Sequence, residues 1–155
     1  MAGISDPRVL KRFIIYLAML TFVMFGVWSF WGTFVETPAG DFEVRAGDIH
    51  LSGGEYEEAI EDFDNALAAQ PNHRGALLGK AAALIQLERY DEAERVLTSA
   101  IGFLKANLDP DDPTGRGALA AAYGNRGIVN DRQGRYEQAL ADYIESLKTD
   151  AESVE

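Results

Sequence analysis

GGEYEEAIEDFDNALAAQPN, the segment at residues 53–72, has a pattern that returns twice along the chain. RYDEAERVLTSA follows at 89–100 and RYEQALADYIESL at 135–147. In each segment a tyrosine is followed by alanines and large apolar residues three or four positions apart, which is the spacing of one helix face. A single helix of this kind leaves its apolar face uncovered. The repetition therefore predicts several helices that stack on one another.

The interval between the segments is regular. The offset that places Tyr56 on Tyr90 also places Ala59 on Ala93. This offset matches the period of about 34 residues that is typical of tetratricopeptide repeats, each of which is a pair of helices. The step from Tyr90 to Tyr136 is longer than one such period, which indicates an insertion before the third segment. The chain resembles the tetratricopeptide repeat family on these residues.

The resemblance implies an all-α domain over residues 40–155, a helical-hairpin solenoid of three repeats. The repeats are expected at about 40–73, 74–107 and 120–153, with an insertion at 108–119. In the first repeat, Gly47 is the small residue of the first helix, Gly53 and Gly54 form the turn, and Pro71 closes the second helix. The second repeat lacks both the turn glycine and the closing proline.

The insertion begins with LDPDDPTGRG at 108–117. Its prolines, glycines and acidic residues predict a surface loop after a lengthened helix in the second repeat. Asp109, Asp111 and Asp112 suggest a calcium loop, but the glycine is misplaced and no glutamate stands at the twelfth position. We therefore expect no metal site there.

Before the repeats, the whole segment FIIYLAMLTFVMFGVWSFWGTFV at 13–35 is free of charged residues. At 1.5 Å per residue, a helix of this length is roughly 30 Å long or slightly more, which matches the hydrocarbon core of a bilayer. A cleaved signal peptide has a shorter apolar region, and a soluble core helix has a polar face. The segment predicts a transmembrane helix, with Gly26, Ser29 and Thr33 as small residues that suit packing on another helix.

The flanking charges predict the orientation of this helix. Arg8, Lys11 and Arg12 lie in residues 1–12, whereas the linker at 36–39 has no basic residue. By the positive-inside rule, the N-terminus is cytoplasmic and the repeat domain is periplasmic, on a single-pass protein of the inner membrane. The absence of cysteine is compatible with an oxidising compartment.

Composition narrows the possible functions. After residue 35 the chain holds 24 Asp and Glu against 11 Lys and Arg, a formal charge of −13. This charge repels nucleic acid and attracts basic proteins, although it also simply keeps an exposed domain soluble. His50 and His73 are the only histidines, and no nucleophile or phosphate-loop motif accompanies them. We expect no enzyme, no catalytic residue, no cofactor and no metal.

The family resemblance implies that a protein partner binds along the concave face formed by the first helix of each repeat. The corresponding residues are Val44, Asp48, Leu78, Ala82, Ile85, Gly124 and Ile128. These positions lack the basic and asparagine residues with which chaperone-binding members hold a C-terminal carboxylate. Only about two residues follow the third repeat, so the last helix is expected to cap itself or to be covered by a partner.

Two classes of function remain open at this point. In the first, the chain is a membrane-anchored scaffold or adaptor, an accessory subunit that stabilises a larger bacterial membrane complex such as an electron-transfer complex. In the second, it is a membrane-anchored assembly factor or chaperone for exported clients, as in cytochrome c maturation. Both predict protein partners in or at the membrane, with the N-terminal helix in the lipid bilayer.

Overall fold

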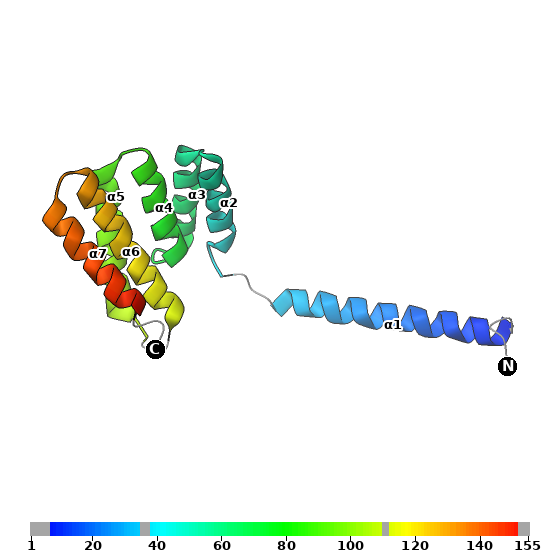
Figure 1. Cartoon of the computed structure of the whole chain (residues 1–155). Helices are drawn as coiled ribbons and strands as arrows, with labels where there is room; N and C mark the ends of the chain where they lie inside the picture. Colours follow the sequence, from blue (N-terminus) through cyan, green and yellow to red (C-terminus); the bar gives the residue numbers. More distant parts are fainter. Residues whose placement is uncertain (1–6, 35–37, 110–111, 152–155) are drawn as a thin grey trace. The chain divides into compact units, whose positions relative to one another are not determined.

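The computed structural model of the chain describes residues 7–34, 38–109 and 112–151, and these residues form seven helices. The prediction of an all-α fold is confirmed. The chain divides into two units, Met1–Thr37 and Pro38–Glu155, the first of which contains only helix α1. Figure 1 shows α1 and the repeat domain, which are described separately below.

Helix α1 comprises Pro7–Phe34. It begins before the predicted apolar segment and includes the basic residues near the N-terminus. Its portion Pro7–Ser29 has a mean hydropathy of 1.8, and its length and composition would allow it to cross a membrane. Val35 and the side chain of Thr33 lie outside the described residues. A side chain at Gly26 would meet nothing within 4 Å, so the glycine is open to a neighbour.

The second unit consists of three helical hairpins. They are α2 (Asp41–Gly53) with α3 (Tyr56–Ala69), α4 (Arg74–Gln86) with α5 (Tyr90–Asn107), and α6 (Pro113–Arg132) with α7 (Tyr136–Ala151). The first helices contact one another, α2 with α4 and α4 with α6, whereas the backbones of the second helices do not approach one another within the described chain. The stack therefore curves with α2, α4 and α6 on its concave side (Figure 1).

The insertion differs from the sequence-based expectation. Helix α5 is lengthened to Asn107, as predicted, but the loop expected over 108–117 is wrong in its second half because α6 begins at Pro113. The Asp112 carboxylate caps this helix by accepting a hydrogen bond from the Thr114 amide at 2.9 Å. Proline at the first helical position lacks the N–H that would otherwise need a partner. These two residues together start the helix early.

The core between the first two repeats is built around Phe63. Its ring is fully buried, and it lies between Gly47 on α2 and Gly79 on α4. A Cβ on Gly47 would come within 2.6 Å of Phe63 Cε1, and one on Gly79 would come closer still to the same ring. Real side chains do not approach so closely in a packed core. Glycine at both positions therefore allows three helices to share one aromatic ring.

The three hairpin turns use the same backbone conformation at equivalent positions. Gly54 and Gly134 have φ of 80° and 75°, and Glu88, at the equivalent position of the second repeat, has φ of 58°. A left-handed conformation costs an ordinary L-residue about 1–2 kcal/mol, whereas glycine adopts it freely. The turn glycine that the sequence lacks in the second repeat is thus replaced by a strained glutamate.

A buried polar network fixes α7 on α6. Asp142 on α7 is only 5% exposed and accepts two hydrogen bonds from Arg126, at 2.9 and 2.6 Å, and one from Asn130 at 2.9 Å. The hydrogen bonds to Asp142 raise the pKa of the Arg126 guanidinium above its usual value. A paired and hydrogen-bonded charge can be buried, but removing one partner leaves the other uncompensated. The network therefore specifies the position of α7 on α6.

The close packing of Phe63 against Gly79 predicts a loss of stability when a single methyl group is added at residue 79. Gly79→Ala should lower the free energy of unfolding by about 1–2 kcal/mol, because overpacking outweighs the higher helix propensity of alanine. The measurement is urea unfolding of the full chain in mild detergent, followed by far-UV circular dichroism. Gly102 on α5 is the matched control, since a Cβ there would meet nothing within 4 Å. Gly102→Ala should be neutral or stabilising, and equal destabilisation by both variants would contradict this packing.

The turn geometry gives a prediction of opposite sign. Glu88→Gly should stabilise the chain by about 0.5–1 kcal/mol, because it relieves the left-handed strain at a modest entropic cost. Gly134→Ala should destabilise it by about 1–2 kcal/mol for the same reason. A Cβ at Gly134 would have no atom within 4 Å, so any loss comes from the backbone rather than from a clash. Thermal melting of the two variants beside the wild type measures both effects.

Candidate functional site

The concave face is the first candidate surface. The seven residues predicted from the family resemblance lie on its three helices, two on α2, three on α4 and two on α6. Val44, Leu78 and Ile85 are half-buried and pack against the core, whereas Asp48 is exposed and Ile128 is 38% exposed. A Cβ on Gly124 would meet only Ser146 Oγ on α7, at an ordinary contact distance of 3.4 Å, so this position borders the contact between α6 and α7. Ligand binding by this set stays a prediction.

Charge is distributed unevenly between the two sides of the stack. The concave helices α2, α4 and α6 together carry six Lys and Arg against four Asp and Glu. The outer helices α3, α5 and α7 carry three Lys and Arg against twelve Asp and Glu. The negative charge of the domain is therefore concentrated on its convex side. The helices that line the concave side therefore carry a slight excess of basic residues.

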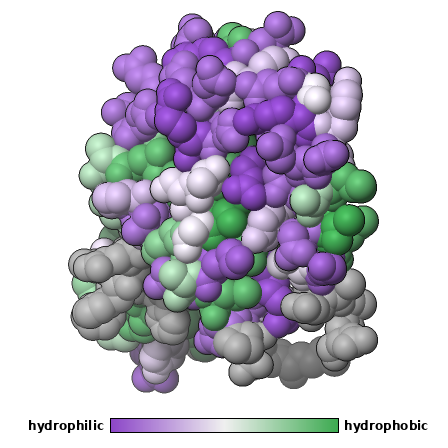
Figure 2. All heavy atoms as spheres, turned by 90° about the vertical axis from the view of Figure 1, so that its left-hand side faces the viewer, coloured by the Kyte–Doolittle hydropathy of each residue, from purple (hydrophilic) through white to green (hydrophobic). Residues whose placement is uncertain are grey.

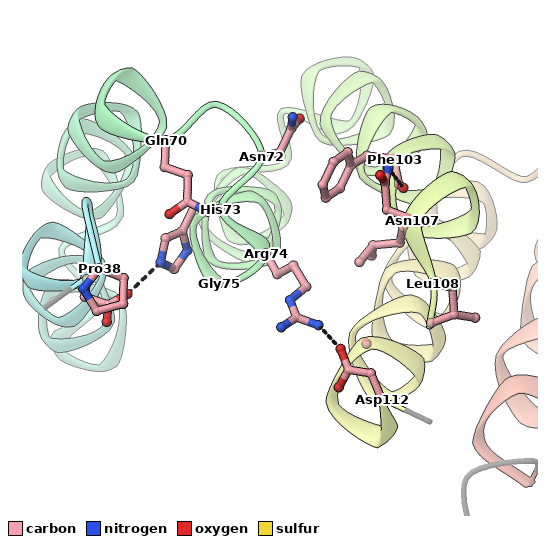
Figure 3. Close-up of a pocket in the computed structure, with 13 residues that line it drawn as sticks. Pro38, Gln70, Asn72, His73, Arg74, Gly75, Phe103, Asn107, Leu108 and Asp112 are labelled. Carbon is pink, nitrogen blue, oxygen red and sulfur yellow. Dashed lines mark hydrogen bonds and ion pairs between the residues drawn. The ribbon is translucent and has the colours of Figure 1, made fainter. Parts of the chain in front are cut away.

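A cavity of about 510 Å³ lies where α2, α4 and α6 begin and α5 ends. Figure 3 shows the amide side chains of Gln70, Asn72 and Asn107 around it. Phe103 and Leu108 supply an apolar wall. Amide side chains both donate and accept hydrogen bonds, as a peptide backbone requires. The lining is thus chemically suited to a short peptide segment.

Two pairs of charged or polar side chains hold the cavity together. His73 precedes α4, and its Nδ1 accepts a hydrogen bond from the Ala76 amide at 3.3 Å. This leaves the proton on Nε2, which donates to Asp41 Oδ1 at 2.9 Å. His73 therefore caps α4 and links it to the start of α2 (Figure 3).

On the opposite side of the cavity, Arg74 Nη1 donates to Asp112 Oδ2 at 2.8 Å (Figure 3). Asp112 also accepts hydrogen bonds from the hydroxyl and the amide of Thr114. The Thr114 hydroxyl, followed by Arg74, holds the pKa of the Asp112 carboxyl well below its usual value. The pair joins α4 to the first turn of α6. The two links together connect all three repeats at this end of the stack.

The ionisable side chains around the cavity are paired with one another. Both ring nitrogens of His73 are engaged, so in this arrangement it is not poised to take a proton from a ligand. Within residues 7–34, 38–109 and 112–151, no group of three or more His, Cys, Asp or Glu could hold a metal ion. Asp111, part of the rejected calcium loop, lies outside these residues.

Comparison with known families agrees with the geometry. Two sequence models of the tetratricopeptide repeat family match the chain, one over residues 44–113 and the other over residues 119–150. The chain belongs to the tetratricopeptide repeat family. This family is a class of protein-interaction modules, so the expectation of protein binding is confirmed at that level. A comparison with curated proteins gives no significant match.

Solved tetratricopeptide repeat domains share the fold. The Arabidopsis OM64 domain has a TM-score of 0.62 at 22% identity, and the alignment covers 73% of this chain and 84% of that one. The first such domain of Spaghetti (RPAP3), solved with the HSP90 peptide SRMEEVD, has a TM-score of 0.63 at 20% identity over 77% of this chain and 87% of that one. The first domain of human RPAP3 has a TM-score of 0.62 at 22% identity, over 74% and 84% of the two chains.

The tetratricopeptide repeat pattern did not reveal the polar links around the cavity. Asp41, His73, Arg74 and Asp112 come from three different hairpins, so no short motif contains them. One local signal was present. His73 follows Pro71 and Asn72 at a repeat junction, where a helix cap is expected. The pairing of Arg74 with Asp112 depends on the early start of α6, which the sequence did not predict.

The cap at His73 can be separated from its link to Asp41. His73→Asn should preserve a side chain that caps α4, whereas His73→Ala should remove the cap and lower stability by roughly a further 1 kcal/mol. The melting temperatures of the two variants measure the difference. Asn72→Ala is a suitable control, because Asn72 is exposed and lies beside the same cavity. Equal melting of the His73 variants would show that the cap is unimportant.

Proposed function

We propose that this chain is a membrane-anchored docking subunit that stabilises a larger bacterial membrane complex, an electron-transfer complex being one candidate. The observation that carries the proposal is the presence in one chain of a long charge-free apolar segment, residues 13–35, and a tetratricopeptide repeat domain. A soluble adaptor would not need the helix, and a simple anchor would not need three repeats. Together they suit binding of a protein partner at the membrane surface.

The anchor is supported by the chemistry of α1. Within Pro7–Ser29 all described side chains are exposed, which places a long apolar surface outside any protein core. A bilayer is the ordinary environment for such a surface. Arg8, Lys11 and Arg12 favour a cytoplasmic N-terminus, with the repeats on the periplasmic side. In this arrangement, Gly26 and its neighbours offer a contact face to another membrane helix.

The short connection supports action close to the membrane. Residues 35–40 separate the last residue of α1 from the first residue of α2. At up to 3.6 Å per residue, this connection spans at most about 25 Å. If α1 crosses the bilayer, the repeat domain can reach only partners whose binding segments lie near the surface.

The concave face supports recognition of an extended or helical protein segment. Its half-buried apolar residues offer contact area, and Asp48 and Ile128 are accessible to a ligand. Two similar domains of Spaghetti were solved with a bound peptide, which agrees with a segment of this kind. The acidic convex side would instead attract basic partners in a salt-dependent manner.

The proposal is tested by co-purification of the tagged full chain from native membranes. Asp48→Lys with Ile128→Glu should lose the partner, because the change alters charge and removes apolar area on the concave side. Glu61 on α3 is exposed on the convex side, so Glu61→Lys is the matched control and should retain the partner. Both variants should melt like the wild type.

Membrane attachment is tested separately with Leu17→Arg and Leu20→Arg combined in α1. This variant should leave the membrane fraction on washing, because two central charges oppose insertion. Protease added to intact spheroplasts should cut the repeat domain of the wild type. Equal partner recovery by the concave variant would refute docking through that face, and protection of the repeats in spheroplasts would refute the orientation.

A further inference from the structure

The repeat stack ends in apolar faces on both sides. On α7, Tyr136, Leu140 and Leu147 are 69%, 61% and 70% exposed, and Ile144 lies beside them. These residues are spaced along one helix face. On α2, Phe42 and Ile49 are 76% and 71% exposed and also share a face. Figure 2 views the side of the domain that carries α7 and shows green apolar patches within a largely purple surface.

The repeat period identifies what the α7 face does elsewhere in the molecule. The positions of Tyr136 and Leu147 correspond to Tyr56 and Leu67 in the first repeat and to Tyr90 and Ile101 in the second. All four of these equivalents are half-buried or buried. In the first two repeats this face packs on the first helix of the next repeat, since α3 contacts α4 and α5 contacts α6. The α7 face is therefore equivalent to a packing surface between repeats, and the described residues leave it uncovered.

The α2 face is the opposite half of the same joint between repeats. Phe42 and Ile49 correspond to Ala76 and Ala83 on α4, and to Ala122 and Val129 on α6. All four of these equivalents are fully buried. They lie on the helix face that meets the preceding hairpin. The domain thus exposes, at its two ends, the two complementary surfaces that pack together between repeats inside the chain.

Side-chain contacts inside the chain establish the register of this joint. Lys80 on α4 donates to Asp64 on α3, and Arg126 on α6 donates to Thr98 on α5. These two pairs occupy equivalent positions. The next pair in the series would be Ala46 on α2 with Ile144 on α7, and these two residues lie at opposite ends of the repeat domain. The two pairs inside the chain are polar, whereas the equivalent pair at its ends, Ala46 with Ile144, is apolar.

We propose that the stack continues between molecules, with the Phe42 and Ile49 face of one copy seated on the α7 face of a second copy. The register places Ala46 of one copy against Ile144 of the other. Phe42 and Ile49 are larger than the three alanines and the valine at the equivalent internal positions, so the helices of the two copies lie further apart than those within a chain. This contact is heterologous, and its repetition gives chains of copies rather than a closed pair.

The contact is expected to be weak and reversible. One copy contributes the four apolar side chains of α7, and the other contributes Phe42 and Ile49. Side chains of this number and size bury only a few hundred Å² on each copy, which is less than the area of a standard stable interface. Glu55 of one copy also falls near Glu137 of the other, where the internal joint has Arg89 beside Glu57. Anchoring of all copies in one membrane would raise their local concentration and offset this weakness. High salt should strengthen the contact by screening the two glutamates.

Cysteine cross-linking tests the proposal cleanly, because the natural chain has no cysteine. Full-length Ala46→Cys and Ile144→Cys variants carry different tags and are expressed together in one membrane. A short thiol-reactive cross-linker is then added. We expect dimers that contain both tags, and ladders of higher species when one chain carries both cysteines. Glu61→Cys, at an exposed site on α3, replaces Ala46→Cys in the control and should give only background.

Each variant expressed alone distinguishes the possible occupants of the α7 face. Ile144→Cys alone should not cross-link to itself, and dimers in that sample would show an α7–α7 pair and overturn the proposal. Leu140→Asp in the Ile144→Cys copy should lower the mixed dimer about tenfold, since it places a charge in an apolar contact. Leu140 is exposed, so this change should leave the fold intact. A yield of mixed dimers no higher than that of the Glu61→Cys control would also overturn the proposal. In that case a different protein or a further segment would bind the α7 face.

Discussion

The burial of one aromatic ring between two glycines is the contact on which the shape of the repeat domain depends. Phe63 belongs to α3 but touches the backbones of α2 and α4 at Gly47 and Gly79. Because both neighbours lack a side chain, the two concave helices can approach the same ring and each other. This approach brings Val44 and Leu78 into the core while leaving part of their surface on the concave side. The candidate binding face is thus a product of close packing.

The third repeat meets the same requirement with a different pair. Tyr143 on α7 packs against Gly127 on α6, where a Cβ would come within 2.6 Å of the ring. The family pattern identified Gly47 as the small residue of the first repeat. Its equivalent one period later is Ala81, which is also buried, so the pattern gives no signal for Gly79. A period read from sequence finds equivalent positions, but it does not reveal a second close approach made by only one repeat.

Other differences between expectation and structure have local physical causes. The hairpins were predictable because their apolar spacing extends over whole helices. The start of α6 was not, because Asp112 and Pro113 act as a helix start within a segment whose composition otherwise favours a loop. The conformation of Glu88 follows from the geometry of the hairpin turn, which Gly54 and Gly134 adopt at the equivalent positions, rather than from its own preference. The cavity depends on pairs such as Asp41 with His73, far apart in the sequence, which only the folded stack brings together.

The separation of charge between the two sides follows from the way the helices are used. The outer helices have one apolar side for packing, and their remaining positions face water, where acidic residues are readily accommodated. The concave helices are covered on several sides, and their basic residues are partly occupied by internal partners such as Asp64 and Asp142. The net charge of the chain is therefore a poor guide to what the concave face would bind.

Helix α7 has a further consequence for the lifetime of the protein. Among the described helices it packs on α6 alone, whereas α4 contacts α2, α3, α5 and α6. In a stack held together by nearest neighbours, an end helix can open without disturbing the rest. The Arg126–Asp142 ion pair resists this opening. If the pair breaks, the backbone of α7 becomes accessible to proteases. Amide hydrogen exchange should be fastest in α7 among the repeat helices, and degradation in the cell would then begin at this end of the domain.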